Sequence, residues 1–194
     1  SSERHLVLAS GSKTTSEAWL LDAGRPSDAF ICVSPRQEGH EYEVDHGLLD
    51  GQWRWFIRSN QAGINFALYT APEDTPEHAH WQLLRPHDPQ VMLEDIDLNS
   101  TAHVLSLREG GLSVLEVHPA RASAYRVALP DAVYSLHVAS TLEFDSPVIR
   151  LRYESLNRPA QIRQLELASG AQQVLKETPV EGPFDAEAYE TRRL

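Results

Sequence analysis

The feature that most constrains this sequence is an even repeat of short apolar stretches. Each repeat holds an apolar stretch with a central leucine, then a polar turn, then a second apolar stretch that ends near a proline or a charged residue. The leucines of the four repeats are Leu20, Leu68, Leu115 and Leu165, at steps of 48, 47 and 50 residues. So regular a period predicts a repeat architecture, in which neighbouring units bury each other's apolar faces.

The second repeat is the most clearly defined, and it reads as four short strands. Turn-forming residues separate the strands, as at Asp50-Gly51 and Asn60–Gly63. Apolar side chains such as Trp53 and Trp55 alternate with polar ones, which indicates half-buried strands. The predicted strands are Glu41–Leu48, Gln52–Ser59, Asn65–Thr70 and Trp81–Pro86. Four antiparallel strands in about 45 residues are the size of one β-propeller blade.

The same period divides the whole chain into blades. We expect an incomplete blade at residues 1–36, complete blades at 41–87, 91–129 and 132–178, and an exit segment at 179–194. The incomplete blade holds three predicted strands, His5–Ala9, Glu17–Ala23 and Phe30–Val33, and the blade at 91–129 is expected to end on a strand at Ala124–Pro130. The fold class is all-β, a partial β-propeller. Because closed propellers have about four to eight blades, this open arc is expected to self-associate through its free edges or to be only marginally stable.

Composition narrows the classes of partner. The net charge is −11, with 17 basic and 28 acidic residues, so a nucleic-acid-binding surface is not expected. An acidic field attracts cationic peptides, although it also serves solubility alone. The single cysteine, Cys32, lies in an apolar strand and cannot form an internal disulfide, which indicates a core residue and a reducing, cytoplasmic compartment. No apolar run is long enough to span a membrane.

The sequence offers no catalytic, cofactor or metal motif. The nearest match to a serine-hydrolase elbow, Gly111–Leu115, lacks the second glycine, so Ser113 is interpreted as structural. No glycine-rich phosphate loop is present. His40 and His46 would lie about 20 Å apart along one strand, and His78 and His80 lie in a polar loop. We therefore expect no metal site and no cofactor.

Two groups of carboxylates begin the first two complete blades and are the candidate site. They are Glu41, Glu43 and Asp45, and then Glu94, Asp95 and Asp97. In a propeller the first strand of each blade lines the central channel, and alternation turns some of these side chains into the channel and others into blade packing. They either bond neighbouring blades or attract a cationic peptide. A general acid–base role is not expected, because the sequence supplies no nucleophile.

The chain also resembles a known family in order along almost its whole length. The matching stretches are Ser12–Glu17, Leu20–Ala23, Pro35-Arg36, His40–Tyr42, Asp45-His46, Arg58–Asn60, Gly63, Asn65-Phe66, Leu93–Asp95, Val174–Lys176, Tyr189 and Arg192–Leu194. They are similar to the propeller of the oligopeptidase B group, within the prolyl oligopeptidase family of serine peptidases. The resemblance covers roughly the second half of that propeller and includes no catalytic motif.

The resemblance implies a function for the parent protein. Members of the family join a seven-bladed propeller to an α/β-hydrolase domain, and this group cleaves short peptides after Arg or Lys while the propeller excludes large substrates. The catalytic triad would then lie beyond Leu194, so this chain by itself would be inactive. In prolyl-specific relatives a propeller loop reaches the active site with an Arg and a Cys, and the matching Ser10–Ser16 has neither.

Two other functions remain open on sequence alone. A free-standing interaction propeller of the WD40 or kelch kind is one alternative, although neither the Trp-Asp repeat nor the double-glycine pattern of those propellers recurs. The other is a small glycan- or peptide-binding domain that uses Trp53, Trp55 and Trp81, but their alternating positions favour core packing.

Overall fold

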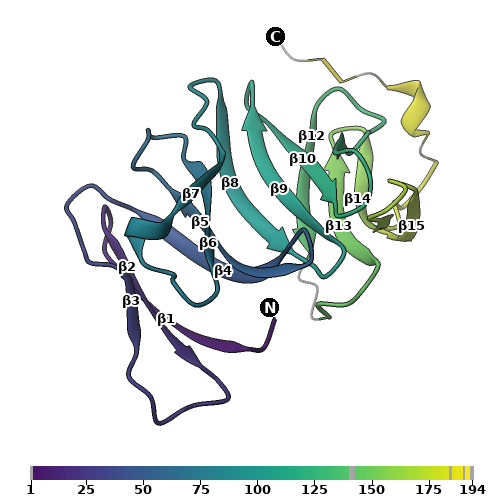
Figure 1. Cartoon of the computed structure of the whole chain (residues 1–194). Coiled ribbons are helices and arrows are strands. Elements are labelled where there is room, and N and C mark those ends of the chain that lie inside the picture. Colours follow the sequence, from purple (N-terminus) through teal and green to yellow (C-terminus); the bar gives the residue numbers. More distant parts are fainter. Residues whose placement is uncertain (1, 140–142, 184, 190, 193–194) are drawn as a thin grey trace.

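The computed structural model describes residues 2–139, 143–183, 185–189 and 191–192, and within them fifteen strands form four antiparallel sheets (Figure 1). The first sheet holds β1 (His5–Gly11), β2 (Ser16–Asp22) and β3 (Ile31–Ser34). The second holds β4 (Tyr42–Leu49), β5 (Gln52–Ser59), β6 (Ala67–Pro72) and β7 (Gln82–Arg85). The third holds β8 (Val91–Leu98), β9 (Ala102–Glu109), β10 (Leu112–Pro119) and β11 (Tyr125–Arg126). The fourth holds β12 (Tyr134–Ala139), β13 (Val148–Ser155), β14 (Arg158–Glu166) and β15 (Gln172–Glu177).

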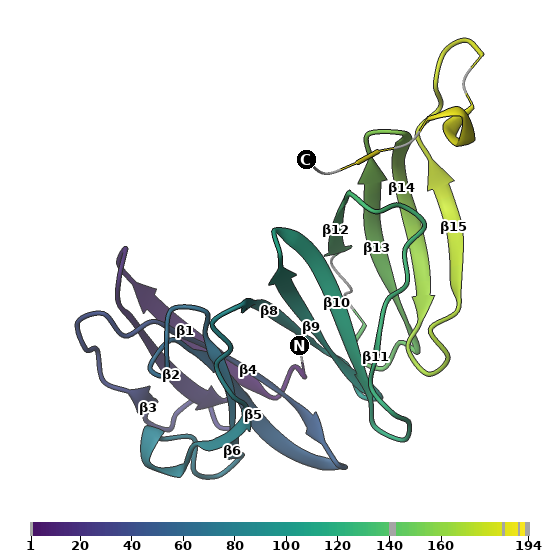
Figure 2. The ribbon, with the colours of Figure 1, turned by 90° about the horizontal axis from the view of Figure 1, so that it is seen from above.

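Each sheet is a meander, in which every strand pairs with the next one along the chain. The turn between β4 and β5 shows why. Asp50 and Gly51 both have positive φ, 52° and 77°, which is the conformation of a tight hairpin turn whose twist matches the strands. Such tight turns join strands that are consecutive in the sequence. The sheets lie one after another in chain order, each turned relative to the one before (Figure 2). The fold is the open β-propeller arc that the period predicts.

The core consists of three apolar layers, one between each pair of adjacent sheets. Leu20 and Val33 meet Tyr42 and Trp55 between the first and second sheets. The residues that fill the second layer are Phe56, Leu68, Val91, Leu93, Leu105 and Leu107. The residues that fill the third layer are Ala102, Val104, Leu115, Val117, Leu136, Ile149, Leu151, Tyr153, Leu165 and Leu167. The sheets are therefore held together mainly by side-chain packing between faces.

This layering corrects the expectation of half-buried strands. Trp55, Phe56 and Ile57 are consecutive in β5 and all buried, because the second sheet is covered on both faces. Trp55 and Ile57 face the first sheet and Phe56 faces the third. Trp55 therefore belongs to the core rather than to an exposed binding surface, and Trp81 packs against the same layer.

Some strand limits also differ from those expected. The predicted strand Asn65–Thr70 begins only at Ala67, because Phe66 has a φ of 60° and its N–H bonds Gly63 in a turn. The predicted strand Ala124–Pro130 shortens to Tyr125–Arg126. Within the described residues the helical elements are the short 3₁₀ turns η1 (His78–His80) and η2 (Ala186–Ala188). No helix there has the length and apolar character needed to cross a membrane.

The first strands of adjacent complete sheets lie side by side, and a glycine lets them approach. A Cβ on Gly47 of β4 would lie only 2.9 Å from Cδ1 of Leu98 in β8. β4 and β8 carry five of the six candidate carboxylates, so acidic residues of the two blades lie on neighbouring strands.

Candidate functional site

Three of the six candidate carboxylates gather where β4 and β8 run side by side. Asp45 lies on β4, and Asp95 and Asp97 lie on β8. Asp45 and Asp97 are partly buried and line one small pocket together, whereas Asp95 is exposed. The three side chains form the inner acidic cluster, a name kept below for Asp45, Asp95 and Asp97.

The environment of this cluster makes ionisation costly. Burial, together with the negative charges of Asp95 and Asp45, raises the pKa of Asp97 to about 6. Burial also raises the pKa of Asp45, against the hydrogen bond that its Oδ1 accepts from the backbone N–H of His46. Burial is the larger cause for both residues, and the neighbouring carboxylates add to it.

Two further candidates, Glu43 and Glu94, form ion pairs with arginines, although Glu94 also lines a pocket together with Asp95 and Asp97. Glu43 forms an ion pair with Arg58 at 2.9 Å, and the two residues are opposite each other on β4 and β5. Glu94 sits at a bulge of β8 and binds Arg108 through both carboxylate oxygens, at 2.6 and 3.2 Å. Both glutamates therefore form ion pairs between neighbouring strands of their own sheets.

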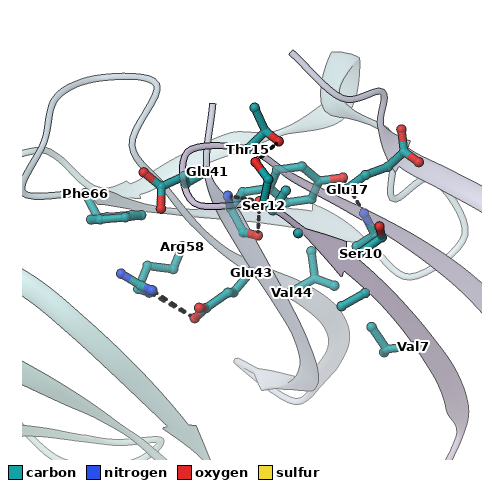
Figure 3. A pocket seen from close by; sticks show the side chains of 15 residues that line it. Val7, Ser10, Ser12, Thr15, Glu17, Glu41, Glu43, Val44, Arg58 and Phe66 are labelled. Carbon is teal, nitrogen blue, oxygen red and sulfur yellow. Dashed lines mark hydrogen bonds and ion pairs between the residues drawn. The ribbon is translucent and has the colours of Figure 1, made fainter. Parts of the chain in front are cut away.

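The sixth candidate, Glu41, lines a pocket of about 350 Å³ between the first and second sheets (Figure 3). Its carboxylate accepts a long hydrogen bond from Asn60 Nδ2 at 3.5 Å. Hydroxyl groups of Ser12 and Thr15, bonded to each other at 2.8 Å, form part of the wall. The six predicted residues thus divide into a cluster, two ion pairs and one pocket residue.

Two other sequence interpretations can be placed in the structure. Ser113 lies inside β10 and is buried, so the near-match Gly111–Leu115 does not form a nucleophile elbow. Cys32 lies in β3 and is half-buried, and burial raises the pKa of its thiol. A raised pKa leaves the thiol protonated and unreactive at neutral pH.

One cluster was missed from sequence because its members come from three separate segments in two sheets. His46 of β4 meets His5 of β1, with ring centroids 4.5 Å apart, and lies beside Glu73, which follows β6. His40, which precedes β4, does not join this cluster. Its Nε2 lies 2.9 Å from Ser59 Oγ. Spacing along one strand cannot show contacts between sheets, so no sequence signal pointed to His5 or Glu73.

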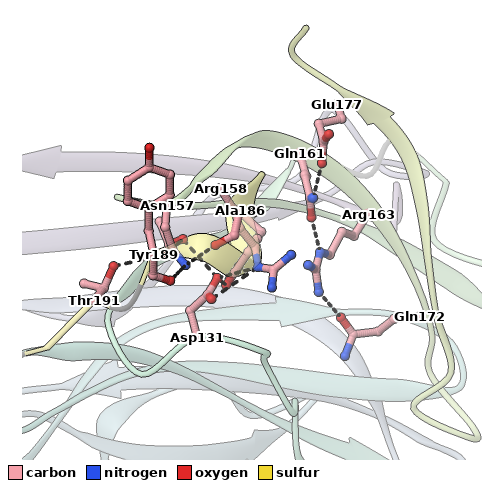
Figure 4. Close-up of polar contacts among 12 residues, drawn as sticks. Asp131, Asn157, Arg158, Gln161, Arg163, Gln172, Glu177, Ala186, Tyr189 and Thr191 are labelled. Atoms are coloured by element: carbon pink, nitrogen blue, oxygen red, sulfur yellow. Dashed lines mark hydrogen bonds and ion pairs between the residues drawn. The ribbon is translucent and has the colours of Figure 1, made fainter. Parts of the chain in front are cut away.

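A polar network joins Asp131 to strands of the fourth sheet (Figure 4). Asp131 accepts hydrogen bonds from Tyr153, Ser155 and Arg158. Burial alone would raise the pKa of Asp131, but these three donors lower it.

The expected exit segment is joined to the same region. Asn157 donates to the carbonyl groups of Ala186 and Tyr189, at 3.4 and 3.2 Å, and its Oδ1 accepts a hydrogen bond from Thr191 at 3.1 Å. The segment is therefore anchored on the turn between β13 and β14 (Figure 4).

Comparison with known proteins places this arc in a family. The family model described as prolyl oligopeptidase, N-terminal beta-propeller domain, matches residues 1–178. The chain is 30% identical over 193 residues to dipeptidyl aminopeptidase BI of Pseudoxanthomonas mexicana, which covers 99% of this chain and 26% of that protein. It is 26% identical over 195 residues to protease 2 of Moraxella lacunata, covering 100% of this chain and 27% of that protein.

Solved structures show the same arrangement of sheets. Oligopeptidase B from Leishmania major superposes with a TM-score of 0.83 and 26% identity, over 98% of this chain and 28% of that one. Oligopeptidase B from Trypanosoma brucei, with covalently bound antipain in a closed form, superposes with a TM-score of 0.82 and 25% identity. The match covers 95% of this chain and 27% of that one. The chain spans about a quarter of the length of these relatives. It belongs to the prolyl oligopeptidase family, as part of the N-terminal β-propeller domain.

Proposed function

We propose that this chain is a non-catalytic part of a serine peptidase of the oligopeptidase B type. In this proposal the propeller limits access to a separate α/β-hydrolase domain, and the inner acidic cluster attracts short peptides that contain Arg or Lys. The observation that carries the proposal is the gathering of Asp45, Asp95 and Asp97 on two adjacent first strands.

The lack of local neutralisation supports this role. Glu43 and Glu94 each have an arginine partner, whereas no arginine or lysine in the described ranges forms an ion pair with Asp45, Asp95 or Asp97. Low-dielectric walls strengthen the field of such charges, and charged clefts of this kind raise the capture rate of oppositely charged ligands. A cationic peptide would add a positive charge beside these carboxylates.

The test is the salt dependence of peptide capture by the full-length protein. Replacing the three cluster residues by Asn should lower kcat/KM for a short arginyl peptide about three- to tenfold at low ionic strength. The same variant should also flatten the decline of kcat/KM with added salt, because screening removes long-range attraction. An uncharged peptide should be cleaved equally well by both proteins.

A control variant separates the cluster from total charge. Neutralising three exposed carboxylates elsewhere, Glu38, Asp50 and Glu154, changes the net charge by the same amount and should leave kcat/KM unchanged. Equal salt slopes in the cluster variant and the unmodified protein would remove the attracting role. Failure of the full-length protein to cleave arginyl or lysyl peptides would overturn the proposed peptidase function.

A further inference from the structure

We propose that His5, His46 and Glu73 form a binding site for one divalent transition-metal ion of the zinc class, which joins the first sheet to the second. The three residues come from separate elements: His5 opens β1, His46 lies in β4, and Glu73 follows β6. One potential ligand atom from each residue lies within 4.8 Å of the other two.

The distances suit a small ion. Bonds of about 2.0–2.1 Å to nitrogen and oxygen in a tetrahedral site place ligand atoms about 3.3 Å apart. His46 Nε2 and Glu73 Oε1 are already 3.4 Å apart. The His5 ligand atom needs to move by no more than about 1.5 Å to reach this spacing, which a side-chain rotation supplies. Two imidazoles and one carboxylate, with a fourth position for water, form a common zinc ligand set.

Two buried nitrogen atoms at this place have no hydrogen-bond partner among the described residues. They are His46 Nε2 and His5 Nδ1. The His46 side chain is only 3% exposed, so water does not reach it freely. Nε2 faces the Glu73 carboxylate without completing a hydrogen bond. Leaving a buried polar atom unpaired costs about 1–3 kcal/mol, and a cation held between the nitrogen and the carboxylate removes that cost.

Neighbouring residues orient the proposed ligands. In known metal sites, residues next to the ligands do the same through hydrogen bonds. His46 Nδ1 lies 2.8 Å from Ser2 Oγ, so an Nδ1–H that donates to Ser2 leaves the Nε2 lone pair for the ion. The His46 ring stacks on Trp53, with centroids 5.1 Å apart. Trp55 Nε1 donates to the backbone carbonyl of Glu73 at 3.1 Å, which fixes the segment that carries the carboxylate.

The proposed metal site is reached from a surface pocket, and the Arg4 side chain competes with an ion for one of its ligands. A surface pocket of about 300 Å³ is lined by His5, Glu73 and Arg4. Arg4 binds Glu73 Oε1 at 2.9 Å, so its guanidinium competes with an ion for the same oxygen. A carboxylate has enough lone pairs to serve both, but the positive charge of Arg4 weakens metal binding. Removing Arg4 should therefore tighten the site.

The first experiment measures zinc binding to the metal-free full-length protein by titration calorimetry. Glu73→Gln and His5→Asn should each lower the affinity of one zinc equivalent by tenfold or more, and Arg4→Gln should raise it. The matched control is His78→Asn with His80→Asn, which removes two exposed loop histidines and should change nothing at this site. Zinc affinity unchanged by Glu73→Gln and His5→Asn, or lost only in the loop variant, would overturn the proposal.

A second measurement separates ligation from loss of structure. Without metal, Glu73→Gln and His5→Asn should unfold at nearly the same temperature as the unmodified protein, because both side chains are only partly buried. Zinc should raise the melting temperature of the unmodified protein with concentration, and should raise that of the two variants far less. Cobalt added in place of zinc should give the intense visible bands of a four-coordinate ion. The absence of those bands from the unmodified protein would contradict the tetrahedral site.

Discussion

Two carboxylates on one strand show how far the immediate surroundings decide the role of a residue. Glu94 and Asp97 both lie on β8, yet Glu94 binds Arg108 while Asp97 lies partly buried near Asp45 and Asp95. The first pair adds little to stability, because its charges are partly exposed to solvent. The second arrangement costs stability whenever Asp97 is ionised. A site with this cost is consistent with the proposed capture of a cation.

Asp97→Asn should therefore stabilise the protein at neutral pH, by about 2 kcal/mol once solvent screening of the partly buried carboxyl is allowed for. The pKa of Asp97 is about 6 in the folded protein and 3.8 as the ordinary value. Between these values the folded protein retains a proton that the unfolded chain has released, so the contribution of Asp97 to stability falls as pH rises. Urea unfolding at a series of pH values measures this.

The difference between the variant and the unmodified protein isolates Asp97 from the histidines. Burial lowers the pKa of His46 to about 3, and burial with the nearby His118 lowers that of His103 to about 4. These histidines make stability rise with pH over the same range, opposite in sign to Asp97. Parallel pH profiles for Asp97→Asn and the unmodified protein would show that Asp97 has an ordinary pKa. Glu154→Gln, at an exposed position, serves as the control.

At the scale of the strand, the Tyr42 side chain forms hydrogen bonds at an irregular point of a neighbouring sheet. The pairing of β2 with β3 shifts register between Ala18 and Trp19, next to the point where Ala18 lies opposite Ser34. The Tyr42 hydroxyl from β4 accepts hydrogen bonds from the Ala18 and Ser34 N–H groups, at 2.8 and 3.2 Å, and donates to the Ser34 carbonyl at 2.7 Å. It thereby links the first sheet to the second.

Tyr42→Phe should destabilise the protein by about 3 kcal/mol, because three buried backbone groups would lose a partner at once. The free energy of unfolding from urea titration measures the loss. Tyr69→Phe is the matched control, since it removes a hydroxyl beside the same apolar layer. If the two variants lose the same free energy, the Tyr42 hydroxyl does not hold the two sheets together.

At the scale of the whole molecule, the arc exposes an apolar edge. Among the described strands β1 pairs only with β2, and Leu6 and Leu8 of β1 are 53% and 57% exposed. An apolar strand with one unpaired edge is a template for pairing with another chain. The proposed metal site lies at the start of this strand, so an ion there would also fix the position of β1 against the second sheet.

The 194-residue chain produced alone should self-associate through β1, as expected for an open arc. Light scattering over a range of concentrations should show a rising mean mass, and Leu6→Lys with Leu8→Lys should lower it, because charges on an edge strand oppose pairing. Leu83→Lys with Leu84→Lys on β7 is the matched control, since these exposed leucines lie on another sheet. A single monomeric species at every concentration would contradict the prediction.

The sequence alone determined the local and repeating features of this protein. Alternation and turn residues predicted β5 at its observed limits, and the leucine period predicted the propeller arc, because both signals lie within a few residues or within one repeat. The order of short matching stretches was sufficient for the family. The half-buried character expected of β5 was wrong, since alternation describes one covered face and cannot show that a second sheet covers the other.

The tertiary structure alone decided which polar groups meet. Glu43 and Asp45 are two residues apart on β4, but Arg58 neutralises Glu43 while Asp45 lies beside Asp97. His5, His46 and Glu73 come together from three separate elements, although they lie 41 and 27 positions apart along the sequence. Spacing along a strand fixes the face on which a side chain lies. Its partner depends on how sheets pack against one another, and that packing is set by apolar layers distant in the sequence.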